Sequence, residues 1–394
     1  MRSHIVVVSP SYGGAERRFF DVFTGLRRSG VDVVFVAPST LIAELRADHA
    51  DRGDVFPGLV SVAMGSWSRL VFIRRFASIL RTLPRGGYYH YPLNCLWPLH
   101  LGRGDQVSMS VADCTSVPGP FADKRTSVWA WVSFSFTRRI DVLSPTIFAA
   151  MRHQRAAPKM SLTPGGTFLV EPPRDSQTKT PTVVFVSRLV PGKGADDLLD
   201  VLGEVWTQLR PRVPAGFAFR IAGYGPLAER IAARVDALAR AGTPVSFVGY
   251  AAAETLLGPA AVVLSLQETT NFPSRVVAEA LMAGCAAIVR DTGDSRQFGI
   301  DLPGLVYCGA TLDAQEMADQ IATLVDLQMH DASFAGRLRS AAVARFSSPR
   351  YIDYFHHLIC DPSRPAPGSE SQVVAERHKP HRNPSAAAPK DSNV

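Results

Sequence analysis

The segment Ser265–Gly284 (SLQETTNFPSRVVAEALMAG) reads as a loop that leads into a helix, and this helix carries one acidic residue near its start. Pro273 and Ser274 suit a first helical turn, where backbone N–H groups lack partners and attract phosphate or hydroxyl oxygens. Glu279 follows within two turns of this entry, where its carboxylate can accept hydrogen bonds from hydroxyl groups. The segment therefore predicts a site for a ligand that carries phosphate and hydroxyl groups.

A pair of cations forms a second candidate site in the sequence SRLVPGKG. Arg188 and Lys193 follow the apolar run Thr182–Val186 and precede a predicted helix. At the carboxyl end of a parallel strand, both would point into the crevice where open α/β sheets bind ligands. Arg188 could grip phosphate oxygens with its planar fork, and Lys193 could add a mobile charge. Solvated surface cations are the alternative. A Gly-x-x-x-x-Gly-Lys-Ser/Thr phosphate loop is excluded because Ser187 stands at the first glycine position and Gly194 follows the lysine.

Two glycine-rich turns could bring the backbone close to a ligand. Gly13 and Gly14 lie between the first predicted strand and a helix, where they would place free N–H groups at a helix start. A flexible connector is the alternative. Gly223, Gly225 and Pro226 follow another predicted strand and fit the dinucleotide fingerprint Gly-x-Gly-x-x-Ala. No acidic residue ends the next strand, which argues against a dinucleotide, and a tight turn without a ligand is the alternative.

These candidates must be held by strands and helices, and short apolar runs of the buried-strand type recur along the chain. In the first half they are Ile5–Val8, Val31–Val36, Leu59–Ala63, Gln106–Val111 and Ile140–Leu143. In the second half they are Thr182–Val186, Phe217–Ala222, Val245–Val248, Ala260–Leu266 and Ala286–Val289. Helix-like segments separate several of them. The order predicts an α/β protein with two domains, each a mostly parallel sheet wrapped by helices.

The length of 394 residues is too great for one ordinary core, and composition suggests where the chain divides. We expect a first domain over residues 1–160 and a hinge over 161–181, which is rich in proline and glycine. A second domain is expected over 182–345 and a last helix over 346–360. The tail 361–394 has six prolines and few large apolar side chains, so it is expected to be disordered.

The composition is that of an ordinary globular protein, with 46% hydrophobic and 20% charged residues. The formal net charge of +7 favours anionic partners, which could be nucleotide diphosphates, acidic lipid headgroups or nucleic acid. Five cysteines without a Cys-x-x-Cys motif indicate neither a zinc site nor a disulfide framework. No stretch approaches the ~20 apolar residues of a transmembrane helix, so a cytoplasmic location is expected.

The segment 67–85 predicts an amphipathic helix with a basic edge. Its apolar stripe consists of Leu70, Ile73, Phe76, Leu80 and Leu83. Its basic residues are Arg74, Arg75, Arg81 and Arg85. Such a helix can lie on an anionic membrane surface, which would place the protein at the inner face of the plasma membrane. Packing on its own sheet with a solvated basic edge is the alternative.

Taken together, the motifs resemble those of family 4 glycosyltransferases over about residues 5 to 360. Glu279 to Gly284 match the Glu-Ala-Met-Ala-x-Gly part of the family signature closely, with Leu281 and Met282 in its middle. The run from Arg188 to Gly194 matches the family's Arg-Leu-x-x-x-Lys-Gly element. The Gly-Gly-Ala-Glu element is matched by residues 13–16, and the Gly-x-Gly-Pro turn by residues 223–226.

The resemblance implies the fold called GT-B, in which two Rossmann-like domains face each other and the last helix, over 346–360, crosses back to the first domain. The second domain would hold a nucleoside diphosphate sugar and the first a saccharide or lipid-linked acceptor. It implies a metal-independent, hexosyltransferase-like enzyme without cofactor that retains anomeric configuration and builds cell-surface polysaccharide or glycolipid. The donor diphosphate would contact Arg188, Lys193, Gly13 and Gly14. The nucleotide and sugar would contact Gly223, Gly225, Pro226, Glu268, Phe272, Pro273, Ser274 and Glu279, the last through the ribose. Catalytic roles would fall to His90, Asn271 and Glu279, and acceptor contacts to Tyr12 and Asp113. A structural role is the alternative for His90, because a lone histidine is more often structural.

Some residues depart from the family pattern. Asn271 stands where the family has its first glutamate, Ala286 where it has proline, and Gln297 where many members have glutamate. Glu268 could substitute for that first glutamate if the loop is shaped differently. A catalytically silent protein that binds a nucleotide sugar therefore stays open as an alternative, as does an NAD-dependent oxidoreductase. Nucleic-acid binding is not expected, because the cations are spread along the chain without an aromatic-basic module.

Overall fold

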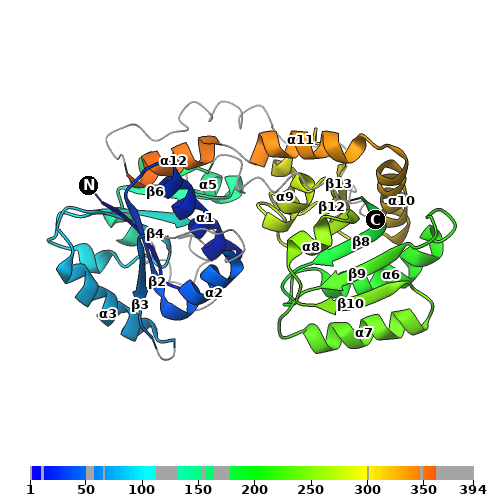
Figure 1. Cartoon of the computed structure of the whole chain (residues 1–394), viewed down its shortest axis with the longest axis horizontal. Coiled ribbons are helices and arrows are strands. Elements are labelled where there is room, and N and C mark those ends of the chain that lie inside the picture. The colour runs from blue at the N-terminus through cyan, green and yellow to red at the C-terminus, as the bar shows by residue number, and fades with distance from the viewer. Residues whose placement is uncertain are drawn as a thin grey trace, which may run out of the picture.

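The computed structural model describes residues 2–9, 13–49, 57–64, 67–111, 132–151, 157–163, 178–299, 301–346 and 349–360. It contains two α/β domains side by side (Figure 1). The first is built on a seven-stranded sheet of order β3-β2-β1-β4-β5-β6-β7, and the second on a six-stranded sheet of order β10-β9-β8-β11-β12-β13. Neighbouring strands run parallel in both sheets, for example β1 with β4 and β8 with β11. The predicted pair of Rossmann-like domains is confirmed.

The first domain alternates strands and helices in the way that parallel sheets require. Its strands are β1 (Ser3–Val7), β2 (Val33–Pro38), β3 (Leu59–Val62), β4 (Tyr88–Leu93), β5 (Gln106–Val111), β6 (Arg139–Val142) and β7 (Met160–Leu162). Its helices are α1 (Gly14–Arg28), α2 (Ser39–His49), α3 (Arg69–Thr82) and α5 (Pro145–Met151), with short 3-10 turns η2 (Trp97–His100) and η4 (Ala157–Lys159).

The second domain follows the same plan and ends in a run of helices. Its strands are β8 (Thr180–Val186), β9 (Ala218–Ala222), β10 (Val245–Gly249), β11 (Ala260–Ser265), β12 (Ala286–Arg290) and β13 (Leu305–Cys308). Its helices are α6 (Ala195–Leu209), α7 (Ala228–Arg240), α8 (Ala253–Leu257), α9 (Arg275–Met282), α10 (Ala314–His330) and α11 (Phe334–Phe346), with the 3-10 turn η5 (Ser295–Phe298). The last helix, α12 (Pro349–Ile359), follows α11.

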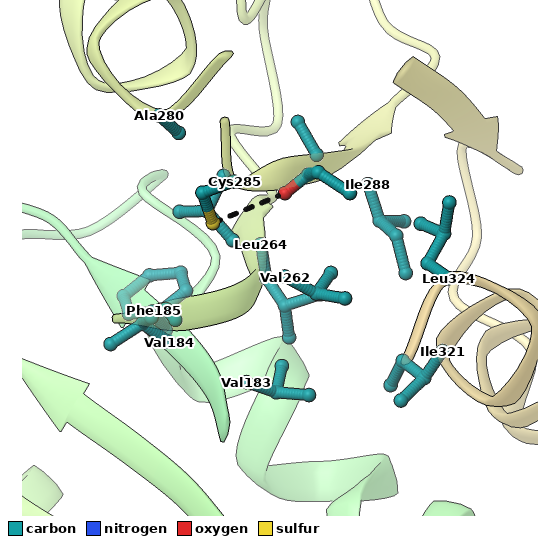
Figure 2. Close-up of a cluster of buried hydrophobic side chains, with 14 of the residues drawn as sticks. Val183, Val184, Phe185, Val262, Leu264, Ala280, Cys285, Ile288, Ile321 and Leu324 are labelled. Carbon is teal, nitrogen blue, oxygen red and sulfur yellow. Dashed lines mark hydrogen bonds between the residues drawn. The ribbon is translucent and has the colours of Figure 1, made fainter. Parts of the chain in front are cut away.

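Burial of alternate strand residues builds a core on each face of the first sheet, because successive side chains of a strand point to opposite faces. In β1, Ile5 and Val7 lie in the cluster that α1 covers, whereas Val6 lies in the cluster that α3 covers. The second domain has one large cluster, part of which Figure 2 shows around Val262 and Leu264 of β11. These strands are buried on both faces and read as continuous apolar runs, as parallel strands do.

The chain crosses between the domains and returns. Helix α12 packs against the first domain, although it follows the second in sequence, through Tyr351, Tyr354, Phe355, Leu358 and Ile359. Strand β7 extends the first sheet to residue 162, past the expected boundary at 160, and β8 begins at residue 180. Most of the expected hinge and the whole tail 361–394 lie outside the described residues. Within the described chain, no helix is long and apolar enough to cross a membrane.

Candidate functional site

The predicted cation pair lies where β8 ends, next to the loop that follows β11. Lys193 Nζ donates a hydrogen bond to Gln267 Oε1, and Arg188 is exposed beside it. Burial lowers the pKa of Lys193, and the like charge of Arg188 lowers it further. An anion placed between the two cations would relieve both effects, because it favours the charged form of the lysine. The geometry therefore suits a phosphate group.

A glycine sets the path of this loop. Gly194 has φ +82°, and a Cβ atom there would lie 2.1 Å from the carbonyl oxygen of Leu266. Only glycine fits, because the left-handed backbone and the close approach both exclude a side chain. The tight contact holds the Lys193 loop against the end of β11, and the Glu268 amide donates to the Gly192 oxygen over 3.1 Å. Glu268 itself is exposed at this edge.

The turn after β9 packs on the Arg188 loop rather than standing open. A Cβ atom at Gly223 would lie 2.0 Å from the Ser187 oxygen, so glycine is required for contact between the two loops. The Leu189 amide donates to the Tyr224 oxygen over 2.7 Å. The fingerprint glycines thus have a structural reason that needs no dinucleotide, while the exposed Pro226 lies at the rim of the same turn. Ligand contact by this turn stays a prediction.

Helix α9 carries the predicted acid, and its carboxylate is already engaged. Arg275 Nε donates to Glu279 Oε1 over 2.7 Å, and Arg275 Nη1 donates to Asp21 Oδ2 of the first domain over 2.6 Å. Arg17 Nη1 lies 4.0 Å from Glu279 Oε1. We call Arg17, Asp21, Arg275 and Glu279 the interdomain clasp. Burial opposes the charge of Arg275, but the Asp21 and Glu279 carboxylates outweigh it and raise the pKa of Arg275.

The clasp places the start of α1 opposite α9. Arg17 and Asp21 are four residues apart on α1 and therefore share one face of that helix. The N-cap residue Gly13 provides no side-chain cap and Gly14 is exposed, so the first N–H groups of this helix have no capping partner from the N-cap side chain. Such groups, with the positive end of the helix dipole, attract anions. The contacts between α1 and α9 thus bring the helix start after Gly13 and Gly14 to the same side of the domain boundary as Glu279.

A second contact joins the domains nearby. The Asp294 carboxylate of the second domain accepts hydrogen bonds from the Ser144 hydroxyl, the Thr146 hydroxyl and, over 3.2 Å, the Thr146 amide. These donors form the first turn of α5, where a carboxylate satisfies helix N–H groups that have no partner within the helix. Together with the clasp, this contact fixes the second domain to the first at two positions.

Asn271 was expected in catalysis, and the structure shows its side chain buried and hydrogen-bonded within the loop. Its side chain is 1% exposed. Its Oδ1 accepts from Ser265 Oγ over 2.9 Å and from the Gln267 amide over 3.0 Å, and its Nδ2 donates to the Arg290 oxygen over 2.8 Å. Every polar atom of this amide therefore serves to close the loop between β11 and α9. Asn271 therefore shapes the loop that carries Gln267, and its role in catalysis stays a prediction.

The other residues of this loop divide between core and rim. Phe272 is 6% exposed and packs on Phe298 with ring centroids 5.2 Å apart, so it supports the loop from the core. Pro273 and Ser274 are half-buried at the entry to α9, where Ser274 is the N-cap residue and its amide donates to the Asn271 oxygen over 2.6 Å. Their contact with a nucleotide stays a prediction.

His90 was expected to touch the donor sugar, and the structure places it inside the first sheet. It lies within β4 and is 0% exposed. Its Nδ1 is 2.9 Å from Ser108 Oγ and its Nε2 is 3.1 Å from Ser110 Oγ. Burial, and then the charge of Arg18, lowers the pKa of His90 to about 3. His90 is therefore a buried, neutral histidine within the first domain, and its contact with a donor sugar stays a prediction.

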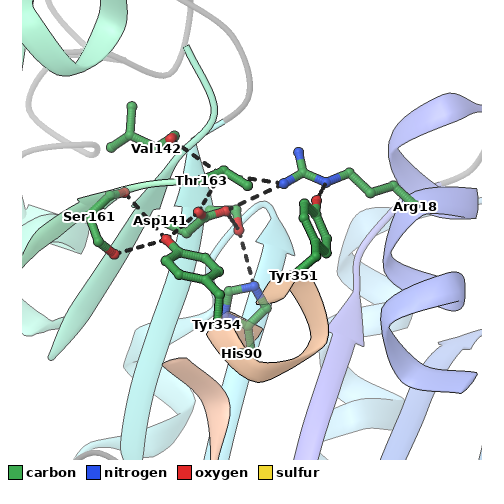
Figure 3. A network of polar contacts seen from close by, with 9 residues as sticks. Arg18, His90, Asp141, Val142, Ser161, Thr163, Tyr351 and Tyr354 are labelled. Carbon is green, nitrogen blue, oxygen red and sulfur yellow. Dashed lines mark hydrogen bonds and ion pairs between the residues drawn. The ribbon is translucent and has the colours of Figure 1, made fainter. Parts of the chain in front are cut away.

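His90 instead adjoins a buried polar network that anchors α12 (Figure 3). Asp141, which is 0% exposed, accepts hydrogen bonds from Ser110 over 2.7 Å, Thr163 over 2.5 Å and Tyr354 over 2.7 Å. Tyr351, also on α12, accepts a hydrogen bond from Arg18. Because a buried carboxylate is costly unless it is fully hydrogen-bonded, these partners fix where α12 sits on the first sheet.

Several site residues could not be placed or were missed. Tyr12 and Asp113 lie outside the described residues. Arg275 and Asp21 were not predicted, since nothing in the sequence pairs residues so far apart, although an arginine within the helix-entry motif could have been noted.

Among the described residues, Asp353, His356 and His357 of α12 form one group whose possible ligand atoms lie within 4.8 Å of one another, on a helix that packs on the first domain.

Comparison with known proteins places these observations in context. Residues 180–326 match the family model described as Glycosyl transferases group 1. No curated protein sequence matches the chain. The TarM protein of S. aureus, solved with UDP, fondaparinux and alpha-GlcNAc-glycerol, is similar in structure with a TM-score of 0.71 at 13% identity, covering 91% of this chain and 99% of that one.

Two further structures are similar over most of both chains. HepE of Anabaena, solved with UDP and glucose, has a TM-score of 0.67 at 14% identity and covers 91% of this chain and 99% of its own. The pneumococcal O-GlcNAc transferase GtfA, solved with UDP and GlcNAc, has a TM-score of 0.67 at 10% identity and covers 96% of this chain and 100% of its own. The chain therefore has the GT-B fold of two Rossmann-like domains, and its second domain carries the match to the group 1 glycosyl transferases.

Proposed function

We propose that this protein is a glycosyltransferase that moves a sugar from a nucleoside diphosphate sugar to a saccharide acceptor. The observation that carries the proposal is the family match, which falls on the domain that holds Arg188, Lys193 and Glu279. The cation pair at the end of β8 supports the same function, because a diphosphate is the ligand that two adjacent cations suit best.

The chemistry asks the protein to stabilise charge on the leaving group. As the acceptor oxygen bonds to the anomeric carbon, the bond from that carbon to the phosphate oxygen breaks and negative charge develops on the diphosphate. The acceptor hydroxyl gives its proton to an oxygen of the departing diphosphate. Arg188 and Lys193 would stabilise this charge from the second domain, and the N–H groups at Gly13 and Gly14 would do so from the first. Charges held in position before the reaction need no reorganisation when it occurs.

Glu279 would orient the nucleotide. A carboxylate that accepts hydrogen bonds from two ribose hydroxyls fixes the sugar nucleotide in one register. In this structure Arg275 and Arg17 flank Glu279, whose side chain is 14% exposed. The exposed fraction leaves room for a ligand to reach it.

We propose UDP as the first nucleotide to test, because three similar structures were solved with UDP. Membership of family 4, transfer of a hexose with retention and without a metal, and a place in cell-surface polysaccharide or glycolipid synthesis at the cytoplasmic side are further parts of the proposal. They rest on the resemblance of the motifs and are tested by product analysis.

The test measures release of nucleoside diphosphate from UDP-glucose, UDP-GlcNAc, GDP-mannose and ADP-glucose, each with and without saccharide acceptors and EDTA. Arg188→Ala and Lys193→Ala should each lower turnover by about 10- to 100-fold, because a charge-assisted hydrogen bond contributes roughly 1.5 to 3 kcal/mol. Arg210→Ala is the matched control, since this exposed cation lies at the opposite end of α6, about 22 Å along the helix.

Binding of UDP without release from any donor would favour the catalytically silent alternative. Near-normal turnover in both variants would remove the phosphate assignment.

A further inference from the structure

The N-terminal end of α3 presents large apolar side chains to solvent. Leu70 is 73% exposed, Trp67 just before the helix is 40% exposed, and Val71 is 38% exposed. They are not needed to attach the helix, because Phe72, Phe76 and Leu80 on its other face are buried in the core. The predicted apolar stripe is thus split: Phe76 and Leu80 pack on the sheet, and Leu70 faces outward.

A groove of about 430 Å³ runs beside this end of α3. It is lined by Arg69, Leu70, Ile73, Leu96, Pro98 and Leu99. The apolar residues come from two elements, α3 and the 3-10 turn η2, so the groove is part of the folded surface rather than a feature of one exposed residue. An open apolar groove with a cation at its edge suits a molecule with an apolar chain and an anionic head.

The charge of this part of the chain is one-sided. From residue 55 to residue 104 there are six arginines and neither lysine, aspartate nor glutamate, so this stretch carries +6 of the formal net charge of +7. Five of these arginines, which are Arg69, Arg74, Arg75, Arg81 and Arg85, are exposed on α3 or just after it. Within the described residues, none of the five forms an ion pair. Opposite charge must therefore come from outside this surface.

The topology places the groove near the carboxyl ends of β3 and β4 in the first sheet. The chain leaves the carboxyl end of β3 to enter α3, and leaves that of β4 to enter η2. Since the strands are parallel, both connections lie at the edge where Gly13 leads into α1. Helix α3 itself lies on the side of the first domain away from the second domain (Figure 1). It can therefore meet a flat surface without obstruction by the second domain.

We propose that this α3 surface, made of Trp67, Leu70, Val71, the groove and the five arginines, docks the protein on an anionic lipid bilayer. The arginines attract the headgroups, and Trp67 and Leu70 enter the boundary between headgroups and acyl chains, where tryptophan is favoured. A bilayer fits these observations better than a folded partner, because it offers negative charge and apolar depth over the whole length of α3. The proposal rests on the proposed function only in that docking would present a lipid-linked acceptor.

Binding of the full chain to vesicles tests the proposal directly. Vesicles of phosphatidylcholine alone and with 30% phosphatidylglycerol are floated with wild type, with R74Q/R81Q/R85Q and with Leu70→Ser. Each arginine near an anionic surface is worth about a factor of five in binding, so the triple variant should bind about 100-fold more weakly. The matched control R210Q/R220Q/R240Q removes the same charge from the second domain and should change binding by less than about three-fold.

Two further readouts keep the outcome interpretable. Thermal unfolding and UDP binding of each variant should match wild type, because the substituted side chains are exposed and lie outside the predicted donor site. Equal lipid binding by wild type and the triple variant would overturn the proposal, as would equal losses in the control. A change in oligomeric state of the α3 variants without any lipid binding by wild type would also overturn it and assign the surface to a second copy of the chain.

Discussion

The interdomain clasp makes a prediction that depends on few atoms. Arg275 bridges Asp21 of the first domain and Glu279 of its own helix, at 2.6 Å and 2.7 Å. The side chains of Arg275, Asp21 and Glu279 are 17%, 1% and 14% exposed, so solvent screens the Arg275–Asp21 pair little. We therefore expect the two domains to be coupled through this pair.

The size of that coupling follows from the geometry. Opposite charges about 4 Å apart interact by about 4 kcal/mol at an effective dielectric constant near 20, and desolvation offsets part of this. Asp21→Asn and Arg275→Gln should each lower the free energy of unfolding by about 3 to 5 kcal/mol, because each leaves a buried charge without its main counter-charge. The double variant should lose less than the sum, with a coupling energy of about 2 to 3 kcal/mol.

A double-mutant cycle in urea, followed by far-ultraviolet circular dichroism, measures this coupling. The exposed pair Arg212–Asp319, whose side chains are 40% and 52% exposed, is the control and should couple by no more than about 1 kcal/mol. Additive effects of the Asp21 and Arg275 substitutions within about 0.5 kcal/mol would show that the two residues do not interact across the cleft.

Three other predictions concern buried residues. Burial lowers the pKa of His90 to about 3 in the folded chain. Below about pH 6.5 the unfolded chain binds a proton at this residue and the folded chain does not. The free energy of unfolding should therefore fall between pH 6.5 and pH 3 by up to about 4 to 5 kcal/mol. His90→Asn, which cannot titrate, should show a shallower fall in urea titrations at pH 7 and pH 4.5, and identical slopes would contradict this. Gly194→Ala should lower the free energy of unfolding by about 3 kcal/mol or more, and Gly216→Ala by about 1 kcal/mol. Both glycines have φ +82°, but only at Gly194 would a Cβ atom collide with another residue. Equal losses in thermal unfolding would count against the close contact. Asn271→Asp should cost about 2 to 4 kcal/mol, because a carboxylate would face the Arg290 oxygen, and a variant as stable as wild type would argue for a free side chain.

The fold was predictable because strands and helices follow from patterns of apolar, turn and cap residues that are close together in the sequence. Buried parallel strands read as apolar runs, so Thr182–Val186 and Ala260–Leu266 were found within a few residues of β8 and β11. The helix that starts after Ser274 and the loop that holds Lys193 were found for the same reason. Turn and cap residues act on their immediate neighbours, and their types report that action.

The roles of individual polar residues were less predictable, because they depend on which face of an element meets which neighbour. His90 lies in a strand whose side chains alternate between the two faces of the sheet. On its face, Phe19 of α1 and Phe355 of α12 pack against the imidazole ring. Asn271 occupies a signature position, yet its amide is taken up by backbone groups of β12 and the preceding loop. Arg275 and Asp21 meet only because the two domains do. Contacts between domains leave no local pattern in the sequence.

Binding of a nucleoside diphosphate at Arg188 and Lys193 underlies the proposed function, and calorimetric titration with UDP measures it. GDP, ADP and NAD are titrated in parallel, into wild type, Lys193→Ala and the Arg210→Ala control. We expect saturable binding of one nucleoside diphosphate, weakened at least about ten-fold in Lys193→Ala and unchanged in Arg210→Ala. Binding of NAD alone, or equal affinity in wild type and Lys193→Ala, would contradict this assignment.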